Sequence, residues 1–105
     1  MAAKQFPSKD PRENVILTFD FSPSLATGVT LSSIYAYSVL VIFGTDSAPT
    51  TIWNGSPAID GTGTKVLVPV TLGNHLADYL ISVTTQTSDP LTRLTLSGIL
   101  PVRSR

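Results

Sequence analysis

Apolar and polar residues alternate along most of the chain, and this alternation restricts the fold more than any other feature. Side chains two positions apart on a strand point to the same face, so an alternating segment predicts a strand with one buried face. Residues 14–21 are apolar at the odd positions, and residues 65–72 at the even positions. The chain also holds 14 Thr, 9 Val and 7 Ile, so 30 of its 105 residues are β-branched, which favours strands over helices. The sequence therefore predicts an all-β fold.

Turn signals separate these segments at short intervals, which is typical of an antiparallel sandwich or a small barrel. We expect strands in residues 14–21, 29–43, 65–72, 79–86 and 94–102, with a break near Ser33 and one further short strand within residues 50–59. Pro69 removes a backbone donor, so its strand is expected at a sheet edge or beside a bulge. Gly98 is expected at a bulge or at a point of close approach.

Two aromatic features bear on binding. Tyr35 and Tyr37 share the parity of Val39 and Val41, so the alternation predicts that both rings are buried, in a strand whose second half is covered on both faces. Alternation does not predict the burial of Trp53, because it lies beside the Asn54-Gly55 turn. It is either a core anchor or an exposed ring for stacking on a sugar or a partner.

Composition narrows the classes of function. A chain of 105 residues allows one domain, and seven basic against seven acidic residues leave no positive field for nucleic acid. There is no cysteine, so packing must supply the stability. The start lacks the apolar core of a secretory signal, and the longest nearly apolar run, Ile34–Phe43, is too short to span a membrane. Apolar residues make up 42% and charged residues 13%, which suggests that some apolar surface meets other chains.

Residues 1–12 are predicted to form an extended arm, and residues 13–105 the sandwich. Pro7 and Pro11 favour extended backbone before them, and Phe6 is the one large apolar side chain of the segment. The segment is either a frayed end or an arm that docks on a neighbouring chain. In the docking interpretation Phe6 is the anchor, Lys9 and Asp10 fix the register, and loss of Phe6 leaves the isolated domain nearly as stable as before.

Charge is distributed unevenly along the chain. Residues 14–89 hold Lys65 against five aspartates, a net charge of −4, whereas residues 90–105 hold three arginines, a net charge of +3. Arg103 and Arg105 either keep this end soluble or complement an acidic surface on a neighbouring copy in a ring or stack.

Residues able to carry chemistry are few. His75 is the single histidine, and its spacing from acidic residues and serines supports no catalytic triad. The scattered carboxylates form no metal-binding pattern, and Gly61-Thr62-Gly63 opens no helix that could bind phosphate. We therefore expect no enzyme activity, no cofactor and no metal.

The two ends of the chain resemble a known family. Residues 4–13 read Lys-Gln-Phe-Pro-Ser-Lys-Asp-Pro-Arg-Glu and are followed by Asp20, Ser22, Leu25 and Gly28; Leu100-Pro101-Val102-Arg103 follows a Thr-rich segment. This pattern is similar to the small fibre-tail adaptor proteins of tailed bacteriophages, and Phe-Pro-x-Lys-Asp-Pro is its most specific part. Residues 73–78 depart from the Gly- and Thr-rich turn expected there.

The resemblance implies an immunoglobulin-like β-sandwich of about seven strands in a virion tail or baseplate, made in the host cytoplasm. Its partners would be a tail fibre protein and tail tube or baseplate proteins, with copies of the chain in a ring, and neither nucleic acid nor membrane. The expected partner-binding residues are Lys4, Phe6, Pro7, Lys9, Asp10, Pro11, Arg103 and Arg105. The alternative is a carbohydrate-binding accessory module, which requires Trp53, Tyr35 or Tyr37 to be exposed on one face.

Overall fold

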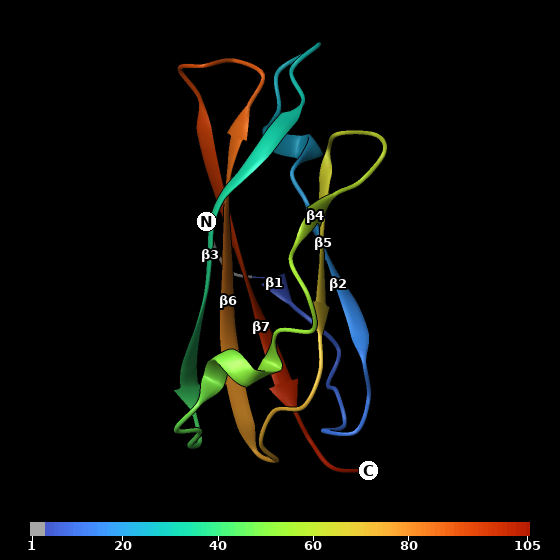
Figure 1. Cartoon of the computed structure of the whole chain (residues 1–105), viewed down its shortest axis with the longest axis vertical. Coiled ribbons are helices and arrows are strands. Elements are labelled where there is room, and N and C mark those ends of the chain that lie inside the picture. Colours follow the sequence, from blue (N-terminus) through green and yellow to red (C-terminus); the bar gives the residue numbers. More distant parts are fainter. Residues whose placement is uncertain (1–3) are drawn as a thin grey trace.

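The structure, a computed structural model, describes residues 4–105 as two β-sheets packed face to face (Figure 1). The strands are β1 (Lys4–Gln5), β2 (Val15–Asp20), β3 (Leu31–Phe43), β4 (Ala58–Ile59), β5 (Lys65–Val70), β6 (Ala77–Thr87) and β7 (Arg93–Val102). Two short 3-10 turns, η1 (Ser22–Ser24) and η2 (Pro49–Ile52), complete the elements. One sheet has the order β1-β7-β6-β3 and the other β2-β5-β4. The all-β sandwich predicted from the alternation is therefore confirmed.

The strand pairs are antiparallel with one exception. β1 runs parallel to β7, with Lys4 opposite Gly98 and Gln5 opposite Ile99. A parallel pair needs a long connection, and here the rest of the chain provides it. The described residues include no helix long and apolar enough to cross a membrane.

The core lies between the two sheets and follows the predicted parity. Val66, Val68 and Val70 of β5 are fully buried, and they face alternate residues of β6 and β7 such as Ile81 and Leu100. Sheets that pack this way interdigitate their inner side chains in a layer about 10 Å thick. The outer residues of the same strands are half-buried or exposed.

β3 departs from the prediction. The expected break near Ser33 is absent, because the strand runs through three register shifts, between Leu31 and Ser33, between Ile34 and Ala36, and between Val41 and Phe43. The first two shifts reset the alternation, so Tyr35 points outward and is 60% exposed. Tyr37 keeps the predicted parity of Val39 and pairs with buried Val83, but it is 40% exposed rather than buried. The expectation that the second half is buried on both faces is also wrong, since Leu40 and Ile42 remain exposed.

Two expectations for residues 65–72 are corrected as well. β5 is the central strand of its sheet rather than an edge, and no bulge is recorded at Pro69, which pairs with Ile16 in register. The carbonyl of Pro69 accepts a bond from Asn54 N, so the side of the strand that lacks a donor faces a loop instead of a full strand. Leu72 was expected to point inward; it lies beyond the strand, is 53% exposed and has a positive φ of 52°.

Candidate interface formed by the terminal segments

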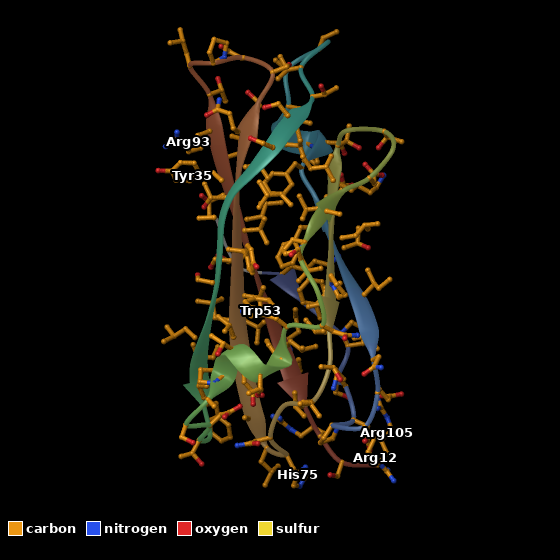
Figure 2. The ribbon with its side chains drawn as sticks, viewed as in Figure 1. Arg12, Tyr35, Trp53, His75, Arg93 and Arg105 are labelled. Atoms are coloured by element: carbon orange, nitrogen blue, oxygen red, sulfur yellow. The ribbon has the colours of Figure 1, made fainter. Side chains whose placement is uncertain are left out.

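The structure brings together the two groups of predicted partner-binding residues, which lie more than 90 positions apart in the sequence. Lys9 forms a parallel bridge with Val102, its N–H donates to the Pro101 carbonyl at 2.9 Å, and Arg103 N donates to the Lys9 carbonyl at 2.8 Å. We call residues 8–13 together with residues 101–105 the terminal clasp. Arg12 and Arg105, at the same end of the molecule as His75, mark its position in Figure 2.

Phe6 lies inside the sandwich and is only 5% exposed. Its ring packs edge-on against Phe19 at a centroid distance of 5.3 Å, and its N–H donates to the Ile99 carbonyl. The ring also lies over Gly98, where an added Cβ would be within 3.1 Å of three of its carbons. The prediction of close approach at Gly98 is thereby confirmed. The expectation that Phe6 is free to anchor on a neighbour is corrected, because in this chain the ring fills its own core.

Lys9 is 2% exposed, which is unusual for a lysine. Its ammonium donates to the carbonyls of Asp10, at 2.9 Å, and Leu72, at 2.6 Å. Burial lowers the pKa of Lys9, while the neighbouring carboxylates of Glu13 and Asp10 oppose that shift. The lysine therefore ties the arm to the loop that follows β5, rather than offering its charge to another chain.

Asp10 is the hub of the clasp. Its carboxylate accepts two bonds from the Arg12 guanidinium, each of 3.0 Å, and bonds of 2.8 Å from the backbone N–H groups of Arg12 and Arg105. The bidentate Arg12 contact and these two N–H donors hold the pKa of Asp10 far below its ordinary value. A charge that was expected to set the register with a partner thus fixes the chain's own two terminal segments.

The C-terminal arginines are paired within the chain as well. Arg103 forms an ion pair with Asp78 at 2.8 Å, and Arg105 forms one with Glu13. Arg105 also donates to the Ser8 carbonyl at 2.7 Å. The positive charge of residues 90–105 is therefore balanced locally at both of these arginines.

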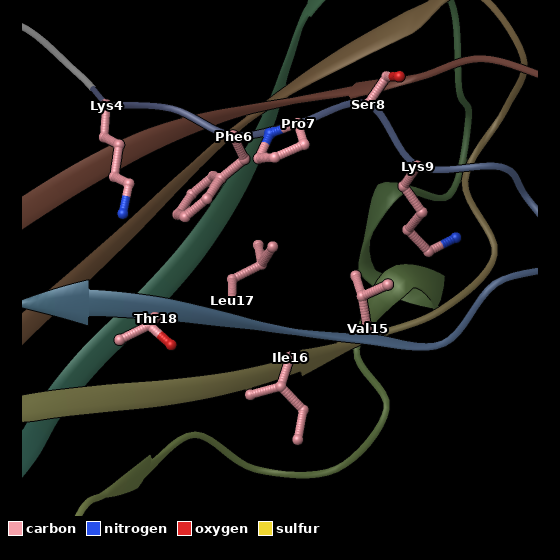
Figure 3. Close-up of a pocket in the computed structure, with 9 residues that line it drawn as sticks. All are labelled: Lys4, Phe6, Pro7, Ser8, Lys9, Val15, Ile16, Leu17 and Thr18. Atoms are coloured by element: carbon pink, nitrogen blue, oxygen red, sulfur yellow. The ribbon is translucent and has the colours of Figure 1, made fainter.

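Other predicted residues remain accessible. Lys4 and Pro7 are exposed and Pro11 is half-buried. Lys4 and Pro7 border a cavity of about 320 Å³ between the arm and β2, into which Phe6, Leu17 and Val15 also face (Figure 3). The lining is mostly apolar. This groove, the exposed side of the arm and the exposed Arg105 are the parts of the predicted interface that a partner can reach.

Sequence reasoning missed three contributors to this end of the molecule. Arg12 and Glu13 lie inside the arm motif, and their charges next to Asp10 were the available signal. His75 had been interpreted as a plain loop residue, but its Nδ1 accepts a bond of 2.9 Å from Ser104 N. No pattern in the sequence indicated that contact, since it depends on how the β5–β6 loop returns to the chain end.

The loop that carries His75 is held in a strained form. Leu72 and Leu76 both have positive φ, 52° and 66°, which is uncommon for residues other than glycine. Tyr79 helps to hold this loop, because its hydroxyl donates to Asp46 at 2.6 Å and accepts from Asn74 N at 2.8 Å. Burial, together with the bond to Asp46, raises the pKa of Tyr79 to about 12.

Two ion pairs lie within the clasp, Arg12 with Asp10 and Arg105 with Glu13. Residues 4–105 contain no group of three or more His, Cys, Asp or Glu side chains placed to hold a metal ion. Comparisons of the chain with protein-family models, with curated proteins and with solved structures find no match.

Proposed function

We propose that this chain is a structural protein of a bacteriophage tail or baseplate, which attaches tail fibres to the tail by protein–protein contacts and performs no chemistry. We further propose that its sandwich is of the immunoglobulin-like type and that it assembles in several copies. In this role its partners are a tail fibre protein and tail tube or baseplate proteins, and its location is the virion.

The strongest support is the placement of the two segments that carry the family resemblance. Residues 4–13 lie against residues 100–105, joined by backbone bonds, by the bond from Arg105 N to the Asp10 carboxylate and by the ion pair of Glu13 with Arg105. A surface fixed in advance loses little conformational entropy when a partner binds. An attachment protein must keep its shape under load, and the clasp joins residues 8–13 and residues 101–105 to the sandwich.

One observation favours the alternative of a carbohydrate-binding module, and two others oppose it. Tyr35 is exposed, as a sugar-stacking ring must be, but the Arg93 guanidinium lies 3.7 Å from its centroid and covers one face of it. Tyr37 and Trp53 contact each other edge to face, with centroids 5.1 Å apart, and Trp53 packs against the core. No free pair of aromatic faces is left among these three rings.

The test is incorporation into particles. Pro7 is exposed on the arm, so Pro7→Asp should fold normally but reduce the amount of the chain in purified tails on the order of tenfold, because it buries a new charge at the contact. Ser24→Asp, which introduces the same charge at an exposed position in η1, is the matched control and should incorporate like the wild type. Equal incorporation of both variants would remove the arm from the contact surface. Absence of the wild-type chain from particles would remove the proposed function itself.

A further inference from the structure

The centre of the outer face of the four-stranded sheet is uncharged and is built from matched rows of side chains. Register places Leu40, Leu80 and Ile99 side by side across β3, β6 and β7, and their sequence neighbours Val39, Ile81 and Gly98 face the core. Residues paired directly across strands lie on the same face, so these three point outward. The next two rows along the strands, on the same face, are Ser38–Ser82–Ser97 and Ala36–Thr84–Thr95.

The hydroxyl groups of these rows bond to one another. Ser82 Oγ lies 2.8 Å from Ser97 Oγ, and Thr84 Oγ1 lies 2.8 Å from Thr95 Oγ1. Burying a polar group costs free energy when its hydrogen bonds to water are lost. Here the two hydroxyl groups of each pair remain bonded to each other after water leaves. The polar centre of the face can therefore be buried at low cost.

Large apolar side chains extend the same face along β3. Tyr35, Leu40 and Phe43 are each 60% exposed, and Ile42 is 46% exposed. At about 150–250 Å² for a whole aromatic side chain and somewhat less for Leu or Ile, these four expose about 400 Å² per copy. An apolar area of this extent on one face is often a functional contact surface.

We propose that this face is covered by a second copy of the chain, packed sheet against sheet with its strands antiparallel about a twofold axis near Ser82. Two copies of the four side chains bury about 800 Å², and the Ser, Thr, Leu80 and Ile99 rows bring the total above the ~1,000 Å² that a stable interface needs. The face is self-complementary at its centre, because no charge lies within the three rows and two copies therefore bring no like charges together there.

The antiparallel arrangement keeps the two copies of Arg93 apart. Asp78, which is already paired with Arg103, lies at one end of β6, and Arg93, opposite Gln86, lies at the other end. Arg93 forms no ion pair within residues 4–105 and instead stacks on Tyr35. The twofold axis places the two Arg93 side chains at opposite ends of the interface, and it places the aliphatic residues Leu40 and Ile42 against Tyr35.

This inference goes beyond the proposed function, because it concerns the isolated chain and holds whatever that chain attaches. It also bears on the alternative role, since a second copy over Tyr35 would exclude a sugar from that ring. An isologous pair is closed, so any larger ring would be built from such pairs.

Sedimentation velocity from about 1 to 200 µM tests the pair. We expect the wild type to move from the 11.2 kDa monomer to twice that mass, and Leu40→Arg to weaken the association at least 100-fold. Ile16→Arg is the matched control, because Ile16 is equally exposed, at 64%, on the other sheet. A wild type that stays monomeric at 200 µM overturns the inference, as does a dimer lost in Ile16→Arg and kept in Leu40→Arg.

Cross-linking tests the geometry separately. Facing sheets lie about 10 Å apart, so a short bis-maleimide should join two copies of Ser82→Cys at the twofold axis. The chain has no other cysteine, which keeps the reaction specific. Ser24→Cys, in η1, should stay uncross-linked. Equal cross-linking of both variants would show random collision and contradict the arrangement. None of these outcomes depends on finding the chain in a particle.

Discussion

Replacing Phe6 by alanine should make this protein unfold at a much lower temperature, although Phe6 is only the sixth residue of the sequence. The ring is 5% exposed, packs edge-on against Phe19 and lies over Gly98. A buried Phe→Ala change costs about 3–5 kcal/mol, and we take the lower end, about 3 kcal/mol, because the arm borders a cavity and can settle inward. At ~4–8 °C per kcal/mol for a domain of this size, the midpoint should fall by about 12 °C or more.

Thermal unfolding followed by circular dichroism measures this effect. Leu91→Ala is the control, because Leu91 is 94% exposed and its truncation should change the free energy of unfolding by no more than about 0.5 kcal/mol. An unchanged midpoint for Phe6→Ala would show that the arm does not belong to its own core. That result would restore the arm to its role as a free docking segment and refute the packing described above.

Three further outcomes follow from the same contacts. Gly98→Ala should destabilise the wild type by pushing the Phe6 ring out, but cost less in the Phe6→Ala background; additive losses in chemical denaturation would contradict the direct contact. Tyr79→Phe should lose about 1–2 kcal/mol, because Asp46 and Asn74 N lose their partner, and an unfolding free energy equal to the wild type would show that water replaces the hydroxyl. Asp10 has a folded pKa below its ordinary 3.8, so the stability it contributes is present above about pH 4 and is lost as the pH falls through the folded pKa. Asp10→Asn should therefore have a lower thermal midpoint than the wild type at pH 7, and the difference between the two midpoints should shrink toward pH 2. A difference that stays constant with pH would show that the ionisation of Asp10 is not coupled to folding.

The strands that alternate without interruption could be predicted from the sequence, and β3 could not. β2, β5 and β6 keep one parity from end to end, so their buried residues follow directly from the two-residue period. In β3 the bulges change the parity, and a bulge depends on the pairing with β6 rather than on residues of β3 itself. Tyr35 was accordingly placed on the wrong face.

The candidate interface could likewise be predicted only in part from the sequence. The arm motif and the basic end were visible in the sequence, and their residues do lie together. Their partners were not visible, because Asp10 binds Arg105 across almost the whole chain length and Lys9 is buried against the Leu72 carbonyl. Such contacts are set by the tertiary fold, and one sequence carries no local signal for them.

The central claim is that the chain is a component of a phage tail, and the most direct measurement is its location. Particles released from cells that produce the chain can be purified, quantified by mass spectrometry and labelled with an antibody for electron microscopy. The account predicts that the chain is present in several copies per particle and that the label lies where fibres join the tail. A chain that stays in the soluble fraction, with no label on any particle, would contradict it.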